Sequence, residues 1–439
     1  MKETPVNYAT VKRILEESGI ETIGKGSIRE IVRVVNNIEK ETGVKFVRME
    51  MGVPGLEPSR IGLDAEKEAL DRGVASKYPM IEGIPELKRE ASRFAELFLD
   101  ISVLPDNCLP TVGSMQGAYA TFLITGRMDR VKNKTLFIDP GFPVQKQQQK
   151  VLGMPYYTFD VYNFRGEELR TKLESYLEKG DVSSIIYSNP NNPSWICFTE
   201  KELQIIGELA NKYNVVIIED LAYFAMDFRT DKSVPGKPPY QPTVANYTDN
   251  YLLLVSASKA FSYAGQRVGL IMVSDILAGK HFSALKAYYP SDKFIYALIY
   301  GALYPLSAGT SHSAQYGVAA LLKAANDGSF NFVENVREYG ERASMMKKLF
   351  MENGFNIVYD HDEEKPLADG FYFTFSYPGM SGAELLEEML YYGISAITLD
   401  ITGSERSEGL RACVSQTHPS RFGEMEERLK QFHQDHPVS

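Results

Sequence analysis

The segment Ser256–Lys259 reads Ser-Ala-Ser-Lys and is followed eight residues later by Arg267. It comes directly after the apolar run 251–255, which is typical of a buried strand. Burial at a strand end disfavours the ammonium form of a lysine, so Lys259 could act as a nucleophile or as the Schiff-base partner of a carbonyl cofactor. The two serines of the segment and Arg267 could hold a phosphate beside that amine.

Two other interpretations of this motif remain open when it is taken alone. A Ser-x-x-Lys sequence also occurs in serine acyltransferases, where the serine is the nucleophile. A lysine at the end of a strand can also be an ordinary solvated side chain. The rest of the chain therefore has to decide among the three.

The elements that would position Lys259 alternate between strands and helices from about residue 108 to residue 275. The short apolar runs in this stretch lie at residues 135–138, 184–187, 215–218, 251–255 and 269–273. Continuous apolar strands separated by helices indicate an α/β fold with a mostly parallel sheet that helices cover on both faces. A loop is expected at residues 232–242, which contain four prolines.

The remaining segments predict a second, smaller unit of α+β type. Helical spacing is present in residues 7–42 and again after Pro85, whereas residues 370–376 and 410–414 resemble strands, and residues 420–434 resemble a closing helix. The 439-residue length also favours two domains. We expect residues 1–60 to join the small domain, residues 61–325 to form the large domain, and residues 326–439 to complete the small one.

Ligands of parallel α/β sheets bind at the carboxyl ends of the strands, and several polar segments are predicted there. Ser114 and Met115 begin a helix after a Gly-Ser turn, whose free N–H groups could bind phosphate, although a plain helix start has the same pattern. Phe142 lies in a turn after a strand, and Asn192 lies in a loop with two Asn-Pro steps. Asp220 lies just beyond four apolar residues, after Glu219, so it either needs a positive partner or caps a helix.

Together these segments resemble the class I and II aminotransferases, which are pyridoxal-phosphate enzymes of fold type I, over nearly the whole chain. The resemblance implies that Lys259 is the Schiff-base lysine and that Asp220 keeps the ring nitrogen of the cofactor protonated. Tyr223 and Asn192 match the residues that hydrogen-bond the phenolic oxygen of the ring. Phe142 matches the aromatic side chain that lies against the face of the cofactor.

The resemblance also implies how the phosphate of the cofactor is held. Ser256, Ser258 and Arg267 match the residues of the phosphate site, and Ser114 and Met115 match the positions at the helix N-terminus. Met115 departs from the family pattern, because its side chain cannot donate a hydrogen bond and only its backbone N–H could serve.

Three further matches concern the substrate and the neighbouring subunit. Arg411 matches the arginine that binds the substrate α-carboxylate, together with Asn192, and Gly52 matches the loop glycine that packs beside the substrate. Tyr78 matches the tyrosine that reaches the cofactor phosphate of the other subunit, so the resemblance implies a homodimer with shared active sites. Its partners would be an α-amino acid and a 2-oxo acid.

The implied activity is transfer of the amino group of an α-amino acid to a 2-oxo acid. Lys259, Asp220 and Tyr223 are the expected catalytic residues, with Lys259 moving the proton between the α-carbon and the cofactor. Two other pyridoxal-phosphate activities stay open, namely a β-lyase that cleaves C–S bonds and a different fold type I enzyme acting on α-amino acids. A regulator with a fused DNA-binding module is disfavoured, because only about fifty residues precede the Met51–Pro54 segment, and they are not strongly basic.

The family usually has glycine where this chain has its only tryptophan, Trp195. The indole could crowd the pocket, redirect the loop or form a wall beside the substrate, or it could pack outward. A tyrosine-rich stretch, residues 288–304, is expected to lie near the subunit boundary, where interface packing is favoured over a role in the substrate pocket. Aromatic, neutral aliphatic and methionine side chains of the substrate all stay open.

Composition excludes several other classes of function. A net charge of −10 argues against nucleic acid as a main partner. The polar N-terminus, the lack of an apolar run of membrane-spanning length and three widely spaced cysteines predict a cytoplasmic protein without disulfides. The six histidines form no metal-binding pattern, so no metal site is expected.

Overall fold

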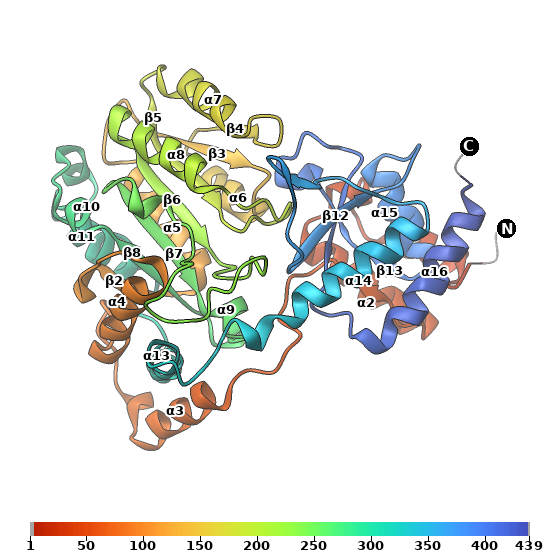
Figure 1. Cartoon of the computed structure of the whole chain (residues 1–439), viewed down its shortest axis with the longest axis horizontal. Coiled ribbons are helices and arrows are strands. Elements are labelled where there is room, and N and C mark those ends of the chain that lie inside the picture. The colour runs from red at the N-terminus through yellow and green to blue at the C-terminus, as the bar shows by residue number, and fades with distance from the viewer. Residues whose placement is uncertain (1–3, 438–439) are drawn as a thin grey trace.

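A computed structural model describes residues 4–437. The chain forms a large body around a seven-stranded sheet and a smaller body that contains both chain ends (Figure 1). The strand order of the large sheet is β2-β8-β7-β6-β5-β3-β4, and all neighbours are parallel except those of β8, which runs antiparallel to β2 and to β7. Its strands are β2 (Cys108–Val112), β3 (Lys134–Asp139), β4 (Tyr156–Asp160), β5 (Val182–Ser188), β6 (Val216–Leu221), β7 (Tyr251–Ser256) and β8 (Val268–Val273).

Both faces of this sheet are buried, and successive residues of a strand enter different cores. Leu253 and Val255 of β7 pack with one helical layer, whereas Leu252 and Leu254 pack with the other. The first layer contains α4 (Pro85–Leu99), α7 (Glu167–Leu177), α8 (Glu200–Tyr213) and α13 (His312–Asn326). The second contains α5 (Gly113–Thr125), α10 (Asp275–Gly279), α11 (Phe294–Tyr296) and the π-helix Ala297–Leu303. This arrangement confirms the predicted α/β fold with a mostly parallel, doubly covered sheet.

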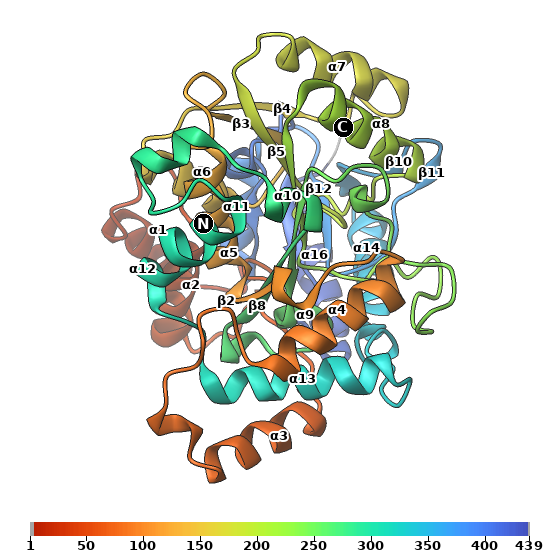
Figure 2. The same ribbon diagram turned by 90° about the vertical axis from the view of Figure 1, so that its left-hand side faces the viewer.

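Several further helices complete the large body. Helix α3 (Arg60–Asp71) packs on α13, which also contacts α4 (Figure 2). The others are α6 (Pro143–Val151), α9 (Ala257–Ala260) and α12 (Tyr304–Ser307). The proline-rich segment 232–242 forms turns and contains neither helix nor strand, as its composition predicted.

The small body is built around the antiparallel sheet β14-β15-β12-β9. Its strands are β9 (Asn356–Ile357), β12 (Tyr372–Ser376), β14 (Ile397–Thr398) and β15 (Leu410–Cys413). Two shorter pairs accompany it, namely β1 (Val47–Arg48) with β13 (Ile394–Ser395), and the hairpin of β10 (His361–Asp362) with β11 (Lys365–Pro366). The helices are α1 (Tyr8–Glu17), α2 (Ile28–Thr42), α14 (Glu338–Glu352), α15 (Gly382–Tyr391) and α16 (Phe422–Asp435).

One hydrophobic core joins the two ends of the chain in the small body. Val11 of α1 and Ile31 of α2 belong to the same cluster of buried side chains as Phe432 of α16. Capping boxes at Ser27 and Ser381 fix the starts of α2 and α15. The predicted domain boundaries after residues 60 and 325 stay a prediction. Within residues 4–437, no helix is both long and apolar enough to cross a membrane.

Candidate active site

The carboxyl ends of β5, β6 and β7 bring together residues that lie far apart in the sequence. Ser188 is paired with Asp220, and Asp220 is paired with Leu254, so the loops that follow these strands meet at one edge of the sheet. Asn192 lies in the loop after β5, Tyr223 follows β6, and Lys259 follows β7 in the short helix α9. The structure therefore places these predicted residues at the same edge of the sheet.

Lys259 is held in a short segment that begins with a buried serine. Ser256 caps α9 by accepting a hydrogen bond from the backbone N–H of Ser258 at 3.2 Å. The Nζ of Lys259 lies 5.9 Å from the ring centre of Phe371. Burial lowers the pKa of Lys259 to about 8; the nearby Cys413 opposes this shift, and Arg267 adds to it. About a tenth of this amine is therefore unprotonated at pH 7, far more than for a lysine in water.

Asp220 is buried at the end of β6 and has two hydrogen-bond donors. Gln145 donates from Nε2 to Oδ2 at 2.9 Å, and the backbone N–H of Ala222 donates to Oδ1 at 3.1 Å. Burial raises the pKa of Asp220 to about 6, although both hydrogen bonds and Lys259 lower it. A protonated pyridine nitrogen would supply the positive partner that this carboxylate needs.

Gln145 was not predicted from the sequence. It lies on α6 one helical turn after Phe142, so the spacing of three residues was the available signal. Phe142 itself is half-buried directly before α6, and the neighbouring Gly141 donates its N–H to Thr402 O of the small body at 2.9 Å.

Arg411 of β15 lies between the two bodies and is only 1% exposed. Its Nη1 donates to Asn192 Oδ1 at 3.1 Å, and its Nη2 donates to Glu50 O at 2.6 Å. Its Nε is buried and has no partner among the described residues. A buried guanidinium with an unused donor has the chemistry for binding a carboxylate.

Two tyrosines that lie next to each other connect Arg411 with the end of β6. The hydroxyl groups of Tyr223 and Tyr372 are 2.7 Å apart, and the Arg411 guanidinium lies 4.5 Å from the ring centre of Tyr372. Gly52 borders the same hydroxyl, since a Cβ at residue 52 would lie 2.0 Å from Tyr372 Oη. Tyr372 was missed from the sequence, although its strand was predicted.

A second group of predicted residues surrounds the N-terminus of α5. Arg267 extends across Gly113, where a Cβ would come within 2.3 Å of Nη2, and Gly113 N–H donates to Arg267 O at 3.0 Å. Ser114 and Met115 follow in the first turn, and the Met115 side chain is exposed. Free N–H groups, a helix dipole and a guanidinium at one place suit a phosphate.

Tyr78 does not contribute to this group within one chain. Its side chain is 93% exposed, which leaves it accessible to another molecule.

Trp195, in contrast, is 1% exposed and lies behind the two tyrosines, edge-on to Tyr223 and Tyr372 at ring-centre distances of 5.4 and 6.2 Å. The interpretation in which the indole packs outward is therefore wrong.

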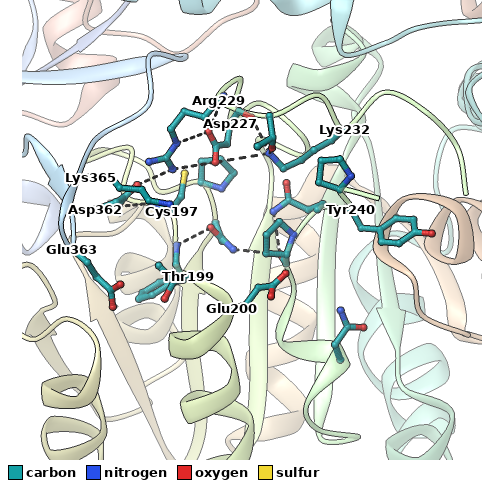
Figure 3. Close-up of a pocket in the computed structure, with 18 of the residues that line it drawn as sticks. Cys197, Thr199, Glu200, Asp227, Arg229, Lys232, Tyr240, Asp362, Glu363 and Lys365 are labelled. Atoms are coloured by element: carbon teal, nitrogen blue, oxygen red, sulfur yellow. Dashed lines mark hydrogen bonds and ion pairs between the residues drawn. The ribbon is translucent and has the colours of Figure 1, made fainter. Parts of the chain in front are cut away.

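The large cavity in Figure 3 lies elsewhere, and Lys259 does not line it. It has a volume of about 1150 Å³ and lies between the proline-rich segment, the start of α8 and the β10–β11 hairpin. Five of its charged side chains already pair with one another, because Asp362 pairs with Arg165 and Arg229, and Asp227 pairs with Arg229 and Lys232. We assign no ligand to it.

Comparison with known proteins agrees with the geometry at the Lys259 edge. A sequence profile described as aminotransferase class I and II matches residues 45–417. The chain belongs to the aminotransferase class I and II family. It is thus a pyridoxal-phosphate-dependent enzyme that transfers amino groups between amino acids and oxo acids.

Individual relatives of this aminotransferase are distant. A probable aspartate aminotransferase of Methanocaldococcus jannaschii is 24% identical over 373 residues, covering 78% of this chain and 93% of the relative. A probable kynurenine–oxoglutarate transaminase of Saccharomyces cerevisiae is 27% identical, and the match covers 54% of each chain. The chain thus spans about half the length of this yeast relative. An alanine aminotransferase structure from Pyrococcus furiosus has the same fold, with a TM-score of 0.75, 19% identity and coverage of 94% of this chain and 98% of that one.

Proposed function

We propose that this aminotransferase binds pyridoxal phosphate at Lys259 and acts on α-amino acids whose carboxylate binds Arg411. The observation that carries the proposal is the arrangement of two groups at one edge of the large sheet and of an arginine from the small body that reaches the loop after β5. A lysine with a lowered pKa lies at the end of β7, a buried carboxylate lies at the end of the neighbouring strand, and a buried arginine has an unused donor.

The described residues fit the parts of the cofactor. Asp220 suits the protonated ring nitrogen, Tyr223 and Asn192 suit the ring oxygen, and Phe142 suits the ring face. Arg267, Ser256 and Ser258 suit the phosphate, with Ser114 and the Met115 N–H at the helix N-terminus. The cofactor supplies the electron sink that stabilises a carbanion at the α-carbon.

The residues of the chain supply the rest of the mechanism. The neutral amine of Lys259 would take the proton from the α-carbon and deliver it to the C4′ carbon of the cofactor, on the other side of the substrate nitrogen. Arg411 and Asn192 fix the carboxylate, so the bond to hydrogen is held in one orientation. Gly52 leaves room for the Tyr372 hydroxyl, which would lie 2.0 Å from a Cβ at this position.

An absorbance experiment tests this function. The purified protein, supplied with pyridoxal phosphate, should show a visible band that bleaches when a reactive amino acid is added without an oxo acid. One oxo acid should be released per site, and a panel of acidic, aromatic and neutral amino acids would identify the substrate class. Pyruvate and ammonia accumulating over many turnovers with a persistent band would contradict transamination as the main reaction.

We further propose that the enzyme is a homodimer with shared active sites. Residues 77–82 lie against residues 300–312, since His312 Nδ1 contacts Lys77 O at 3.0 Å and a Cβ at Gly309 would lie 3.3 Å from Pro79. This face continues to α5, because Gln116 donates to Ser307 Oγ at 2.7 Å. Its exposed apolar and aromatic side chains are Tyr78, Met80, Tyr296, Tyr304 and Leu306.

Light scattering of the purified enzyme tests the dimer. We expect twice the chain mass for the wild type, and we expect the double variant Met80→Lys, Tyr304→Glu to be monomeric and inactive. A fully active monomer would refute the shared site.

A further inference from the structure

Tyr372 occupies the centre of the proposed site, although the activity of the family does not by itself require it there. It is buried on β12 and diagonally opposite Arg411, since Tyr372 pairs with Cys413 and Thr374 pairs with Arg411 in the β12–β15 ladder. Diagonal neighbours on the same face of a sheet are within reach of long side chains. The guanidinium accordingly lies 4.5 Å from the Tyr372 ring centre.

The hydroxyl of Tyr372 makes a separate contact. It lies 2.7 Å from the Tyr223 hydroxyl, and either oxygen could be the donor. A phenol has one proton to donate and two lone pairs to accept with. If Tyr223 donates its proton to the ring oxygen of the cofactor, Tyr372 must be the donor of the bond between the two phenols.

The surroundings of the hydroxyl favour this chain of hydrogen bonds. Trp195 packs edge-on against both tyrosines and restricts their rings. Gly52 has no space for a Cβ, because Tyr372 Oη would be 2.0 Å away, so the loop before residue 55 is shaped around this oxygen. The low polarity around buried phenols strengthens such chains, in which each hydrogen bond polarises the next.

We infer that Tyr372 is a positioning residue with two separable effects, one through its hydroxyl and one through its ring. The hydroxyl donates to Tyr223 and thereby directs the Tyr223 proton toward the ring oxygen of the cofactor. The ring holds the Arg411 guanidinium in place for the substrate carboxylate. This inference rests on the proposed function, because it needs the cofactor at Lys259.

Two variants separate the effects. Tyr372→Phe removes the hydroxyl and keeps the ring, whereas Tyr372→Leu removes both. Tyr223→Phe removes the group on which the hydroxyl acts and serves as the reference. The first readout is the pH titration of the visible band of the bound cofactor, which reports the Schiff-base proton rather than turnover.

The expected shifts follow from competition for charge. A donor on the ring oxygen withdraws negative charge from the neighbouring Schiff-base N–H, so weakening that donor should raise the pKa of the Schiff base. We expect Tyr372→Phe to raise this pKa by about half a unit, because the variant loses only the part of the Tyr223 hydrogen bond that Tyr372 contributes by polarising it. Tyr223→Phe should raise it further, and adding Tyr372→Phe to Tyr223→Phe should change nothing more.

The ring effect is measured in the affinity for the amino acid. We expect Tyr372→Leu to raise KM about three- to thirtyfold relative to Tyr372→Phe, from the loss of a buried cation–π contact, with a smaller change in kcat. Without cofactor, the urea midpoints of Tyr372→Phe and Tyr223→Phe should be non-additive, because both variants break the same bond.

Each result has a defined meaning. If the visible band has the same pKa in Tyr372→Phe as in the wild type, the hydroxyl effect is overturned. If the two Tyr372 variants have equal KM values, the ring effect is overturned. A wild type that forms no visible band with pyridoxal phosphate would overturn the proposed cofactor site and this inference with it. The presence or absence of the wild-type band thus distinguishes the two failures.

Discussion

Replacing Trp195 with glycine should destabilise the protein less than replacing it with alanine. Trp195 has a φ of 66°, in the left-handed region that a residue with a Cβ rarely adopts, and its side chain is buried. Its indole fills the space above Gly370, where a Cβ would lie 2.1 Å from the six-membered ring. The indole Nε1 has no hydrogen-bond partner among the described residues, so the cost of removing it comes from packing.

The magnitudes follow from these two features. Removing a buried tryptophan side chain costs about 3–5 kcal/mol through lost burial and the remaining cavity. Alanine keeps the unfavourable left-handed conformation, which costs about 1–2 kcal/mol, whereas glycine removes it. Part of that gain is offset by the greater freedom of glycine in the unfolded chain. We therefore expect Trp195→Gly to be about 0.5–1 kcal/mol more stable than Trp195→Ala.

Urea unfolding of the cofactor-free protein measures this difference, provided that the m-values agree. Ala343, buried in α14, is a matched control, because Ala343→Gly should lower stability by about 0.5–1 kcal/mol. Ala225 has a φ of 57°, and Ala225→Gly should therefore have the opposite sign to the helix control. If Trp195→Ala is as stable as Trp195→Gly while Ala343→Gly behaves normally, the conformational reasoning is wrong.

Three further outcomes are expected. The cofactor-free enzyme should bind pyridoxal phosphate faster as pH rises, with a midpoint near pH 8 set by Lys259. Stopped-flow absorbance measures this rate, and a midpoint near pH 10 would contradict the prediction. Because folding raises the pKa of Asp220, its ionised form lowers the stability of the folded protein above about pH 6. Cofactor-free Asp220→Asn should therefore be more stable than wild type at pH 8, by roughly 3 kcal/mol at most, and equal to it at pH 4. A stability difference in urea melts that does not vary with pH would argue against burial as the cause. Glu202 is buried, pairs with Arg165 and has a lowered pKa, so Glu202→Gln should cost about 2–4 kcal/mol at pH 7. This loss should disappear as pH falls through the lowered pKa. The same change at the exposed capping residue Glu384 should cost less, and equal costs would refute the role of burial.

The sequence predicted the centre of the fold better than its edges. The five apolar runs between residues 135 and 273 are all strands in the structure. Strands β2 and β4 were not predicted, and they are the two edges of the sheet. Strand β2 contains Pro110, and a proline in a sequence argues against predicting a strand there. Strand β4 is only partly buried, so its sequence lacks a continuous apolar run.

The site residues divide in a similar way. Asp220 lies at the end of a strand, and Lys259 and Asn192 lie in the segments that follow strands, so the predicted strands indicated where these three residues would be. Gln145 and Tyr372 contact other site residues, and neither was predicted. The only signal for Gln145 was its spacing of three residues from Phe142, and no local pattern distinguishes Tyr372 from an ordinary strand residue. The position of the Trp195 indole depends on Gly370 of the small body, a contact between distant parts of the sequence.

The antiparallel strand β8 has a consequence for the order of folding. Val112 of β2 pairs with Val268 of β8, and this single pairing places Gly113 beside Arg267. The two halves of the proposed phosphate site are therefore brought together by a contact that closes a long loop, whose entropic cost slows its formation. A partly folded chain that has already formed the parallel strands β3, β5, β6 and β7 would still lack a phosphate site. Recovery of cofactor binding during refolding should accordingly follow the recovery of secondary structure, and it would mark the docking of the last edge of the sheet.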